Sequence, residues 1–486
     1  MSEQDAPTAG GDQEPFESHD PLHANAARFL IALRDDDASG ALAILRENPS
    51  LATYSIHTAA AVGDVDSVQA MLGDNSELAS ELANAVASGE QAPPIIYAAY
   101  DDIKRALGVS VESQLATVRV LLDAGASPNA SVPLPDVSDS IPVLYFPCTS
   151  GNVPVARLLL ERGANATDGE SLYHAAQHDH RDCLALLVEY GADLNRGPEK
   201  HGNTPLHFLA SHGPDNHITA RALRGMEWLL EHGADPNITS YARRANNSQA
   251  GETPLHRAAA IGHDAAVLKL LVDRGANVNV ARDDGATAYQ LAMRSGNTAS
   301  ATYLESVGAD TTLRDIDRLL HACLTNDATR AREMIARDAS LMTSLEPADR
   351  DALGFAFGFA LSQKNLDAVR LMLALGWPLT HEGEWGGTPL HWAAWNGEVD
   401  VVRLLLEHGA PVNVRDSRYG SSPIAWCAHG SRFNERGNDE EYPAIVHLLI
   451  DAGATRSESY NSWNESPESM ARPSVARAMR ERGFAE

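Results

Sequence analysis

Short apolar helical segments alternate with glycine-containing turns at a regular interval along the chain. Leucine-rich or similar apolar stretches end in Gly-Ala at eight places, whose glycines are Gly125, Gly163, Gly191, Gly233, Gly275, Gly308, Gly409 and Gly453. The spacing from Gly275 to Gly308 is 33 residues. A second landmark, Thr-Pro-Leu-His, occurs at 204–207, 253–256 and 388–391. The distance from Thr287 to Gly308 equals that from Thr388 to Gly409, 21 residues in both cases. The two landmarks therefore keep their phase and predict a repeated two-helix unit.

The clearest unit, residues 387–410, has the residue types that two short helices need. Thr388 can cap the first helix, and Pro389 suits its first turn, where a missing N–H costs nothing. Val402 and the leucines at 404–406 form an apolar stripe on the second helix. Gly409 suits a left-handed position just after the second helix. This unit predicts helix, turn and helix.

These segments resemble ankyrin repeats, of the bacterial type with many degenerate copies. The best match is Gly387-Thr-Pro-Leu-His-Trp-Ala-Ala-Trp-Asn-Gly397 through Leu404-Leu-Leu-Glu-His-Gly-Ala410. Weaker copies at 29–45, 59–72 and 319–335 bring the count to about twelve, with a terminal half-repeat at 466–484. The resemblance implies an all-α ankyrin-repeat solenoid of helix-turn-helix repeats with short hairpin fingers.

The repeats predict one continuous elongated domain instead of three globular ones. We expect a disordered acidic tail at 1–24, an N-terminal repeat block at 25–312, and a C-terminal block at 313–486 that continues the first and includes the terminal cap. Insertions lengthen the repeats at 213–222, 240–251 and 431–442, and another at 101–113 is expected to form additional helix. Insertions in repeat proteins tend to lie in loops on one face.

The charge of the chain narrows the classes of partner. Lys and Arg number 38 and Asp and Glu 66, so the net charge is 38 − 66 = −28. Such a surface repels nucleic acid and anionic membranes and favours a basic partner. The four cysteines are far apart and fit neither a disulfide framework nor a zinc site. The N-terminus does not resemble a signal peptide and no apolar run reaches the ~18–20 residues of a membrane span, so we expect a cytoplasmic protein.

Nineteen histidines suggest chemistry, but the repeat accounts for many of them. Those of Thr-Pro-Leu-His are expected to bond backbone groups of adjoining turns. His174, His178 and His180 look metal-like, yet only the first two share a helix face. No P-loop, nucleophile elbow, dinucleotide fingerprint or His-Glu-x-x-His helix is present. We therefore expect no catalytic residue, no metal and no cofactor.

Aromatic residues are concentrated in one part of the chain, since five of the seven tryptophans lie between 377 and 426. Trp392 and Trp426 follow the Thr-Pro-Leu-His position and are expected in the core. The other candidates lie at positions that face partners in the resembling family, and aromatic side chains are typical interface anchors. The predicted partner-binding residues are Trp385, Trp395, Asn396, Tyr419 and His429. Secondary candidates are Tyr241, Arg243 and Arg244 in a long finger, with Glu382 and Glu384.

The leading interpretation is a non-enzymatic scaffold that binds a protein partner through its concave face and finger loops. The alternative is an enzyme or small-ligand protein with a tryptophan-rich pocket around residues 377–429, where His381 and two glutamates could hold a cationic ligand. A third reading, an effector directed at a host protein, is not separable from the first by sequence. Partner identity and oligomeric state do not follow from the sequence, because unrelated partners are served by one fold.

Overall fold

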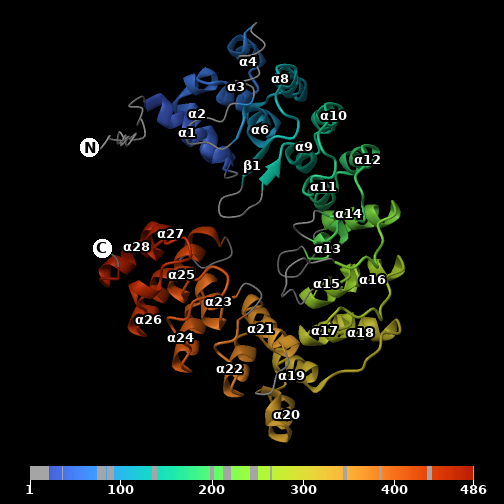
Figure 1. The fold of residues 1–486 in the computed structure, drawn as a ribbon, viewed down its shortest axis with the longest axis vertical. Helices are drawn as coiled ribbons and strands as arrows, with labels where there is room; N and C mark the ends of the chain where they lie inside the picture. The colour runs from blue at the N-terminus through green and yellow to red at the C-terminus, as the bar shows by residue number, and fades with distance from the viewer. Residues whose placement is uncertain are drawn as a thin grey trace, which may run out of the picture. The chain divides into compact units, whose positions relative to one another are not determined.

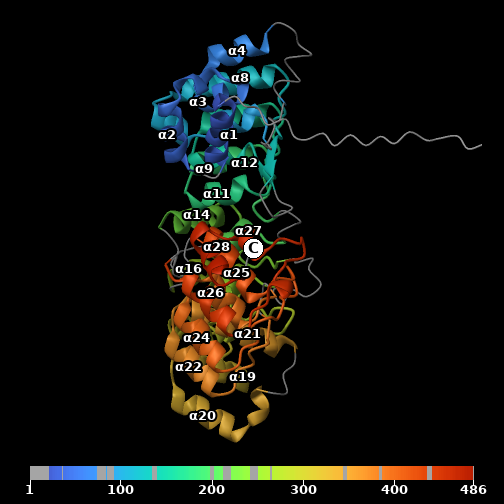
Figure 2. The ribbon, with the colours of Figure 1, turned by 90° about the vertical axis from the view of Figure 1, so that its left-hand side faces the viewer.

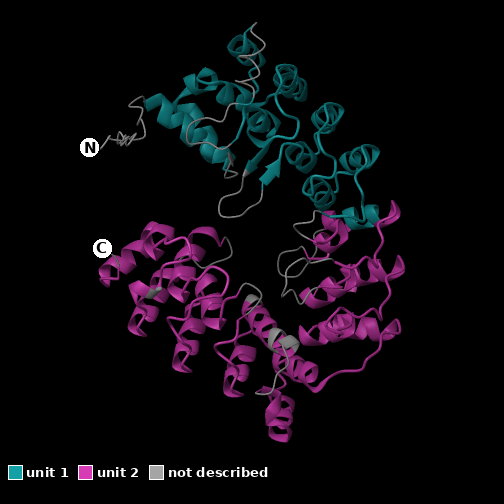
Figure 3. Ribbon diagram, viewed as in Figure 1, with its two compact units in different colours: residues 1–198, 224–229 teal, residues 199–223, 230–486 magenta. Residues whose placement is uncertain are grey.

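The computed structural model describes residues 21–34, 37–73, 84, 92–133, 140–197, 202–211, 220–240, 250–262, 265–342, 347–382, 386–434 and 440–484. The chain divides into two compact units, one made of residues 1–198 and 224–229, the other of residues 199–223 and 230–486 (Figure 3). Each unit is described separately below. The block boundary expected at residue 312 stays a prediction.

The described part of unit 1 consists of helices and one small hairpin (Figure 1). Its strands β1 (Ser131–Pro133) and β2 (Ser140–Pro142) pair antiparallel, with Val132 opposite Ile141. Its helices are α1 (Pro21–Arg34), α2 (Ala38–Glu47), η1 (Pro49–Thr53), α3 (Ile56–Val62), α4 (Val65–Leu72), α6 (Pro94–Ala99), α7 (Asp102–Leu107), α8 (Val111–Asp123), α9 (Tyr145–Ser150), α10 (Val153–Glu161), α11 (Ser171–Gln177) and α12 (Arg181–Glu189).

Unit 2 is built from helices alone in its described part. Helix α14 (Ala220–Glu231) contributes residues to both units. The others are α13 (Pro205–Leu209), α15 (Pro254–Ile261), α16 (Ala265–Asp273), α17 (Ala288–Arg294), α18 (Thr298–Ser306), α19 (Asp315–Leu324), α20 (Ala328–Arg337), η3 (Ala339–Met342), α21 (Pro347–Ser362), α22 (Leu366–Ala374), α23 (Pro389–Trp395), α24 (Val399–Glu407), α25 (Pro423–Phe433), α26 (Tyr442–Asp451), η4 (Arg456–Glu458), α27 (Pro467–Met470) and α28 (Pro473–Glu481).

The described helices form twelve antiparallel pairs and a short terminal pair, α27 and α28, as the sequence predicts. Within each unit first helices pack on first helices, as α15, α17 and α19 do, and second helices pack on second helices, as α8, α10 and α12 do. In unit 2, α22, α24 and α26 lie side by side in both views (Figures 1 and 2). The core between them is apolar, with Leu390, Val402, Leu405 and Ile445 essentially inaccessible to solvent.

Two local expectations have clear outcomes. Helix α1 begins at Pro21, so residues 21–24 are helical and not part of a disordered tail; residues 1–20 lie outside the described part of the chain. The insertion at 101–113 does form an extra helix, α7. It carries Lys104, which is buried and donates from Nζ to the carbonyl oxygens of Tyr97 (2.6 Å) and Tyr100 (2.9 Å). Burial lowers the pKa of Lys104 to about 7.

The third residue of the first helix closes a reciprocal cap on the residue before the helix. In three repeats it is histidine: the Thr388 N–H donates to His391 Nδ1 (3.0 Å), and His391 Nε2 bonds the Ser421 carbonyl oxygen of the next finger (3.0 Å). His207 and His256 make the same bonds, to the carbonyl oxygens of Glu252 (2.8 Å) and Val280 (2.9 Å). The histidine role expected from sequence is therefore confirmed.

Other residue types occupy this position in the weaker repeats. Gln290 accepts from the Thr287 N–H (3.1 Å) and donates to the Thr312 carbonyl oxygen (3.0 Å), so glutamine makes both bonds of the histidine. Asp317 accepts from the Arg314 N–H (3.1 Å). The capping geometry is thus retained where the Thr-Pro-Leu-His sequence is lost.

Asparagines after the Gly-Ala turns join one repeat to the next. Asn413 donates from Nδ2 to the Gly453 carbonyl oxygen (2.8 Å) and accepts from the Thr455 N–H (3.0 Å). Asn129, Asn237 and Asn279 each bond the corresponding glycine carbonyl of the following repeat. A single amide side chain satisfies a backbone donor and acceptor that the turn would otherwise leave to water.

Alternating charges run along the finger side of helices α15, α17, α19 and α21. Asp317 is fully buried and accepts from Arg294 Nε at 2.7 Å. Arg282 forms a two-bonded pair with Asp284, at 3.1 and 2.6 Å. The complete set comprises four arginines and four acids, Arg257, Glu252, Arg282, Asp284, Arg294, Asp317, Arg314 and Asp349. We call this set the ion ladder; it neutralises charges that burial alone would make costly.

Candidate functional site

A connected group of aromatic side chains lies on the first helices and fingers at the C-terminal end of unit 2. Adjacent ring centroids in this group are 4.5–6.5 Å apart, the range of favourable aromatic contacts. We call it the aromatic surface, and it consists of Trp392, Trp395, Tyr419, Trp426, His429, Phe433 and Trp463.

Trp426 forms the floor of the aromatic surface. It is buried, as the sequence predicts, and contacts Trp392, Trp395 and Tyr419. Its indole N–H donates to Asp416 Oδ2 (3.0 Å). The buried Asp416 carboxylate also accepts backbone N–H groups of its own finger, which lies between α24 and α25, including that of Ser421 (2.8 Å). One carboxylate therefore fixes both the central ring and the finger beside it.

Trp395 and His429 occupy equivalent positions on α23 and α25, seven residues after their N-caps, Thr388 and Ser422. Both are half-buried, with their rings 5.3 Å apart, and His429 contacts Phe433 at 4.5 Å. Phe433 is 48% exposed. The sequence-predicted pair thus lies together, and the structure adds Phe433 to it.

The backbone around Trp395 is held by close contacts. Tyr442 donates its hydroxyl to the Trp395 carbonyl oxygen (2.6 Å), and Asn434 Nδ2 donates to the same oxygen (3.1 Å). Asn434 Nδ2 also donates to Asn396 Oδ1 (3.1 Å), so the predicted Asn396 supports α25 in this structure. Gly430 lets the helices approach, because a Cβ there would lie 2.4 Å from the Trp395 oxygen. Burial raises the pKa of Tyr442, which keeps its hydroxyl a donor.

Tyr419 and Trp463 extend the aromatic surface onto two neighbouring fingers. Their ring centroids are 6.1 Å apart and tilted by 36°. Ser462 joins the fingers by donating to the Tyr419 carbonyl oxygen from its backbone N–H (2.9 Å) and its hydroxyl (2.8 Å). Trp463 is 63% exposed. Sequence reasoning missed it, although Trp385, Tyr419 and Trp463 put an aromatic residue in three successive fingers.

Several predicted residues lie outside the described part of the chain. These are Trp385 and Glu384, with Tyr241, Arg243 and Arg244 in the long finger. They stay predictions. Glu382 is described and half-buried. The structure accordingly brings together Trp395, Asn396, Tyr419 and His429, and it says nothing about the five that lie outside the described residues.

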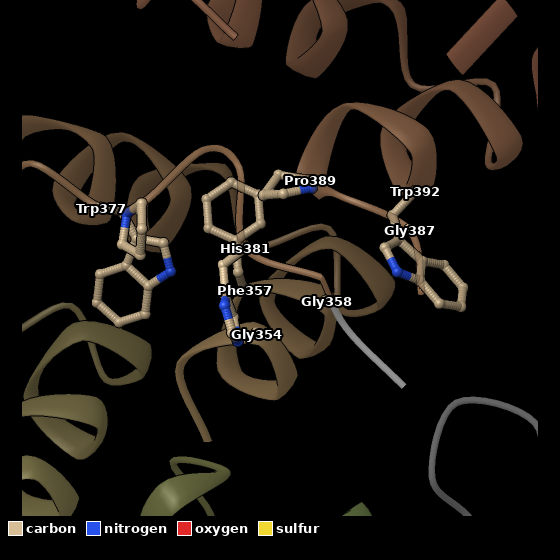
Figure 4. Close-up of a pocket in the computed structure, with 9 residues that line it drawn as sticks. Gly354, Phe357, Gly358, Trp377, His381, Gly387, Pro389 and Trp392 are labelled. Atoms are coloured by element: carbon tan, nitrogen blue, oxygen red, sulfur yellow. The ribbon is translucent and has the colours of Figure 1, made fainter. Parts of the chain in front are cut away.

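A small cavity beside Trp392 is the part of the structure closest to the predicted ligand pocket. It is lined by Phe357, Trp377, His381, Pro389 and Trp392, together with four further residues (Figure 4). Its volume of about 10 Å³ is room for about one water molecule. An organic ligand needs far more space, so this cavity does not support the small-ligand alternative.

The described histidines and cysteines with strongly shifted pKa values are buried side chains that stabilise the fold. Burial lowers the pKa of His207, His256 and His391 to about 4, so all three are neutral at pH 7. Burial also raises the pKa of the Cys427 thiol. It raises the pKa of the Cys323 thiol to about 12. Within the described residues, no three histidine, cysteine or acidic side chains converge as metal ligands would.

Family models agree with this architecture. Models of the ankyrin repeat match residues 105–198, 144–240 and 223–315, and a single-repeat model matches residues 385–417. The chain belongs to the ankyrin-repeat family. Its all-α ankyrin-repeat solenoid extends beyond the matched segments, because further helix pairs occupy residues 21–72 and 315–374.

Curated ankyrin-repeat relatives share only part of their length with this chain. Mouse Rabankyrin-5 is 24% identical over 320 residues, which are 62% of this chain and 25% of that protein. The Drosophila melanogaster transient receptor potential channel pyrexia is 35% identical over 136 residues, 26% of this chain and 12% of the channel. The Arabidopsis thaliana E3 ubiquitin-protein ligase KEG is 24% identical over 288 residues, 57% of this chain and 15% of the ligase.

The chain therefore covers a quarter or less of these three relatives. The likeness supports a general role in protein interaction for the ankyrin repeats of this chain. Within the described part of this ankyrin-repeat chain, every helix is too short or too polar to cross a lipid bilayer.

Proposed function

We propose that this protein is a non-enzymatic scaffold whose aromatic surface binds a protein partner. The site lies on the first helices and fingers, which form the concave face in the solenoid that we predicted. The observation that carries the proposal is the exposure of Trp463 (63%) and Phe433 (48%) at the two ends of one connected group of rings.

The packing beneath these rings supports a binding role. Interface anchors are most effective when they are held in place before the partner arrives, because less side-chain entropy is lost on binding. Trp395 and Tyr419 are fixed by Trp426 below them, and Ser462 ties the Tyr419 finger to that of Trp463. A rigid aromatic group open to solvent is typical of the centre of a protein interface.

The compartment that we propose is the cytoplasm. All four cysteines are buried free thiols, although a long-lived secreted chain commonly pairs its cysteines. The acidic composition, with a net charge of −28, favours a partner with a basic surface. The basic surface can be checked on the partner that the binding experiment identifies.

The proposal is tested by removing the half-buried Trp395 ring and the exposed Phe433 ring on the helical side. The full chain and the double variant W395A/F433A are immobilised, proteins captured from a native lysate are identified, and the purified partner is titrated by calorimetry. Because an anchor typically contributes about 2 kcal/mol or more, the loss of even one of the two anchors in the double variant should weaken binding at least about 30-fold.

Y190A is the matched control, since Tyr190 is 37% exposed at the end of α12 in unit 1. It should bind like the unmodified protein. F433A alone is the second reagent, because this exposed ring can be removed with little effect on the core. Circular dichroism checks that each variant is folded. Unchanged affinity in both F433A and W395A/F433A would refute the proposal.

A further inference from the structure

The finger end of the aromatic surface presents an indole ring with an open face. Trp463 is the most exposed of the large apolar side chains in the described structure, at 63%. Its finger is held by two hydrogen bonds. The backbone N–H of Trp463 donates to Asn461 Oδ1 (3.0 Å), and the Ser462 hydroxyl donates to the Tyr419 carbonyl oxygen. An ordered finger that holds a tryptophan out to solvent has a cost in exposed apolar area and no benefit for the core.

The chain itself places guanidinium groups on the neighbouring rings. Arg418 Cζ lies 5.2 Å from the centroid of Tyr419, and Arg432 Cζ lies 5.2 Å from that of Phe433. Tryptophan attracts cations more strongly than tyrosine or phenylalanine. Yet no described arginine or lysine lies over the Trp463 ring. The strongest cation-binding face at this end of the surface is open.

Trp463 has a carboxylate in its own finger, and the chain as a whole is acidic. Glu465 is an exposed carboxylate of the same finger, held by a hydrogen bond from Asn461 Nδ2 to its Oε2 (2.7 Å). An exposed carboxylate can also accept hydrogen bonds from a guanidinium. The net charge of −28 attracts a basic segment over a longer range.

We infer that the partner of the aromatic surface contributes a basic segment whose arginine stacks on Trp463 and pairs with Glu465. Apolar side chains of the same segment would cover Trp395 and Phe433. This inference rests on the proposed function, because it specifies the partner class of the same site. Arginine fits better than lysine, since its planar guanidinium can lie on the ring and still donate hydrogen bonds at its edge.

Arg418 gives the inference a direction that can be tested. Its guanidinium lies on Tyr419, whose ring is 6.1 Å from that of Trp463, so it places a positive charge near the site. Replacing it by glutamine should therefore strengthen the binding of a basic segment. It should weaken the binding of an acidic segment, for which Arg418 would be a counter-charge.

The experiment selects ligands for the full chain from a phage-displayed library of random twelve-residue peptides. The selected peptides should be enriched in arginine over glutamate and aspartate, and their affinity should fall as the salt concentration rises. For one selected peptide measured by calorimetry, W463A should weaken binding about fivefold and E465Q about threefold, whereas R418Q should strengthen it. Y190A should have no effect.

The outcomes separate the two proposals. If peptides are selected that lose affinity with W395A/F433A but carry no basic residue, or if R418Q weakens their binding, the inference is wrong and the proposed function stands. If no selected peptide depends on Trp395 or Phe433, or if the library yields none, both are overturned. Trp463 and Glu465 are exposed, so W463A and E465Q leave the core intact, and circular dichroism checks this.

Discussion

Acid should destabilise unit 2 mainly through three buried histidines, His207, His256 and His391. Each accepts a backbone N–H at Nδ1 and bonds a carbonyl oxygen through Nε2. That arrangement requires a neutral ring, because a protonated Nδ1 cannot accept. Burial accordingly lowers each pKa from 6.5 to about 4.

The sign and the size of the effect follow from these pKa values. Between pH 6.5 and pH 4 the unfolded chain binds protons that the folded chain excludes, so the stabilisation is complete above pH 6.5 and is lost as the pH falls toward 4. At pH 5 the difference amounts to about 2 kcal/mol for each histidine, or about 6 kcal/mol for all three. A typical domain has a total stability of only about 5–15 kcal/mol, so this loss would be large.

Gln290 supplies a replacement that the fold already tolerates. It makes both bonds of the histidine in its own repeat and does not titrate. In the triple variant H207Q/H256Q/H391Q, the free energy of unfolding should therefore fall much less between pH 7 and pH 5 than in the unmodified protein. Urea unfolding followed by tryptophan fluorescence measures both, because six of the seven tryptophans belong to unit 2.

Other groups titrate in the same range, which makes the comparison between the two proteins the decisive quantity. The loss of unfolding free energy between pH 7 and pH 5 should be larger in the unmodified protein than in the triple variant by several kcal/mol, about 6 kcal/mol by the calculation above. The variant must remain folded at pH 7, where circular dichroism gives the check. If both proteins lose the same stability between pH 7 and pH 5, the capping histidines do not carry the pH dependence and the reasoning is wrong.

Two further changes test the packing. Replacing the fully buried Asp317 by alanine leaves Arg294 without its 2.7 Å partner, which should lower the free energy of unfolding in urea by about 3–5 kcal/mol. The control D315A, on the exposed side of the same helix, should lower it by under about 1 kcal/mol. Replacing Gly430 by alanine puts a Cβ 2.4 Å from the Trp395 carbonyl oxygen and should lower the melting temperature by roughly 2–8 °C. The control G358A should leave the melting temperature unchanged, because its Cβ would have no neighbour within 4 Å.

The repeat fold was predictable because its caps and turns are local. Thr388 and Pro389 determine how a helix starts, and Gly409 determines how one ends, so a single sequence indicates the unit and its period. The capping position in weaker repeats was not predictable in the same way. In the helix Asp315–Leu324 the capping position is held by Asp317 and not by His321. A carboxylate also accepts the backbone N–H, and it has Arg294 as a partner in the fold.

About half of the aromatic surface was predictable from repeat phase. Trp395 and His429 hold equivalent positions, so their contact follows from stacking one repeat on the next. Phe433 and Trp463 were missed because insertions interrupt the phase at and after α25, and only the three-dimensional fold shows that their rings remain exposed. The importance of Trp385 stays a prediction, since it lies outside the described residues.

The first-helix side of unit 2 changes in character from one end to the other. From α15 to α21 neighbouring repeats are joined by the ion ladder, whose inner members are paired with one another and thus offer a partner little charge. From α23 to α27 they are joined by rings, with Trp426 between Trp395 and Tyr419. A ring that packs on one face can still present its other face or edge, whereas a paired buried charge has used its bonding capacity. Because each repeat contacts only its neighbours, this difference is local. The aromatic end is therefore where the same contacts that stabilise the stack can also bind a partner.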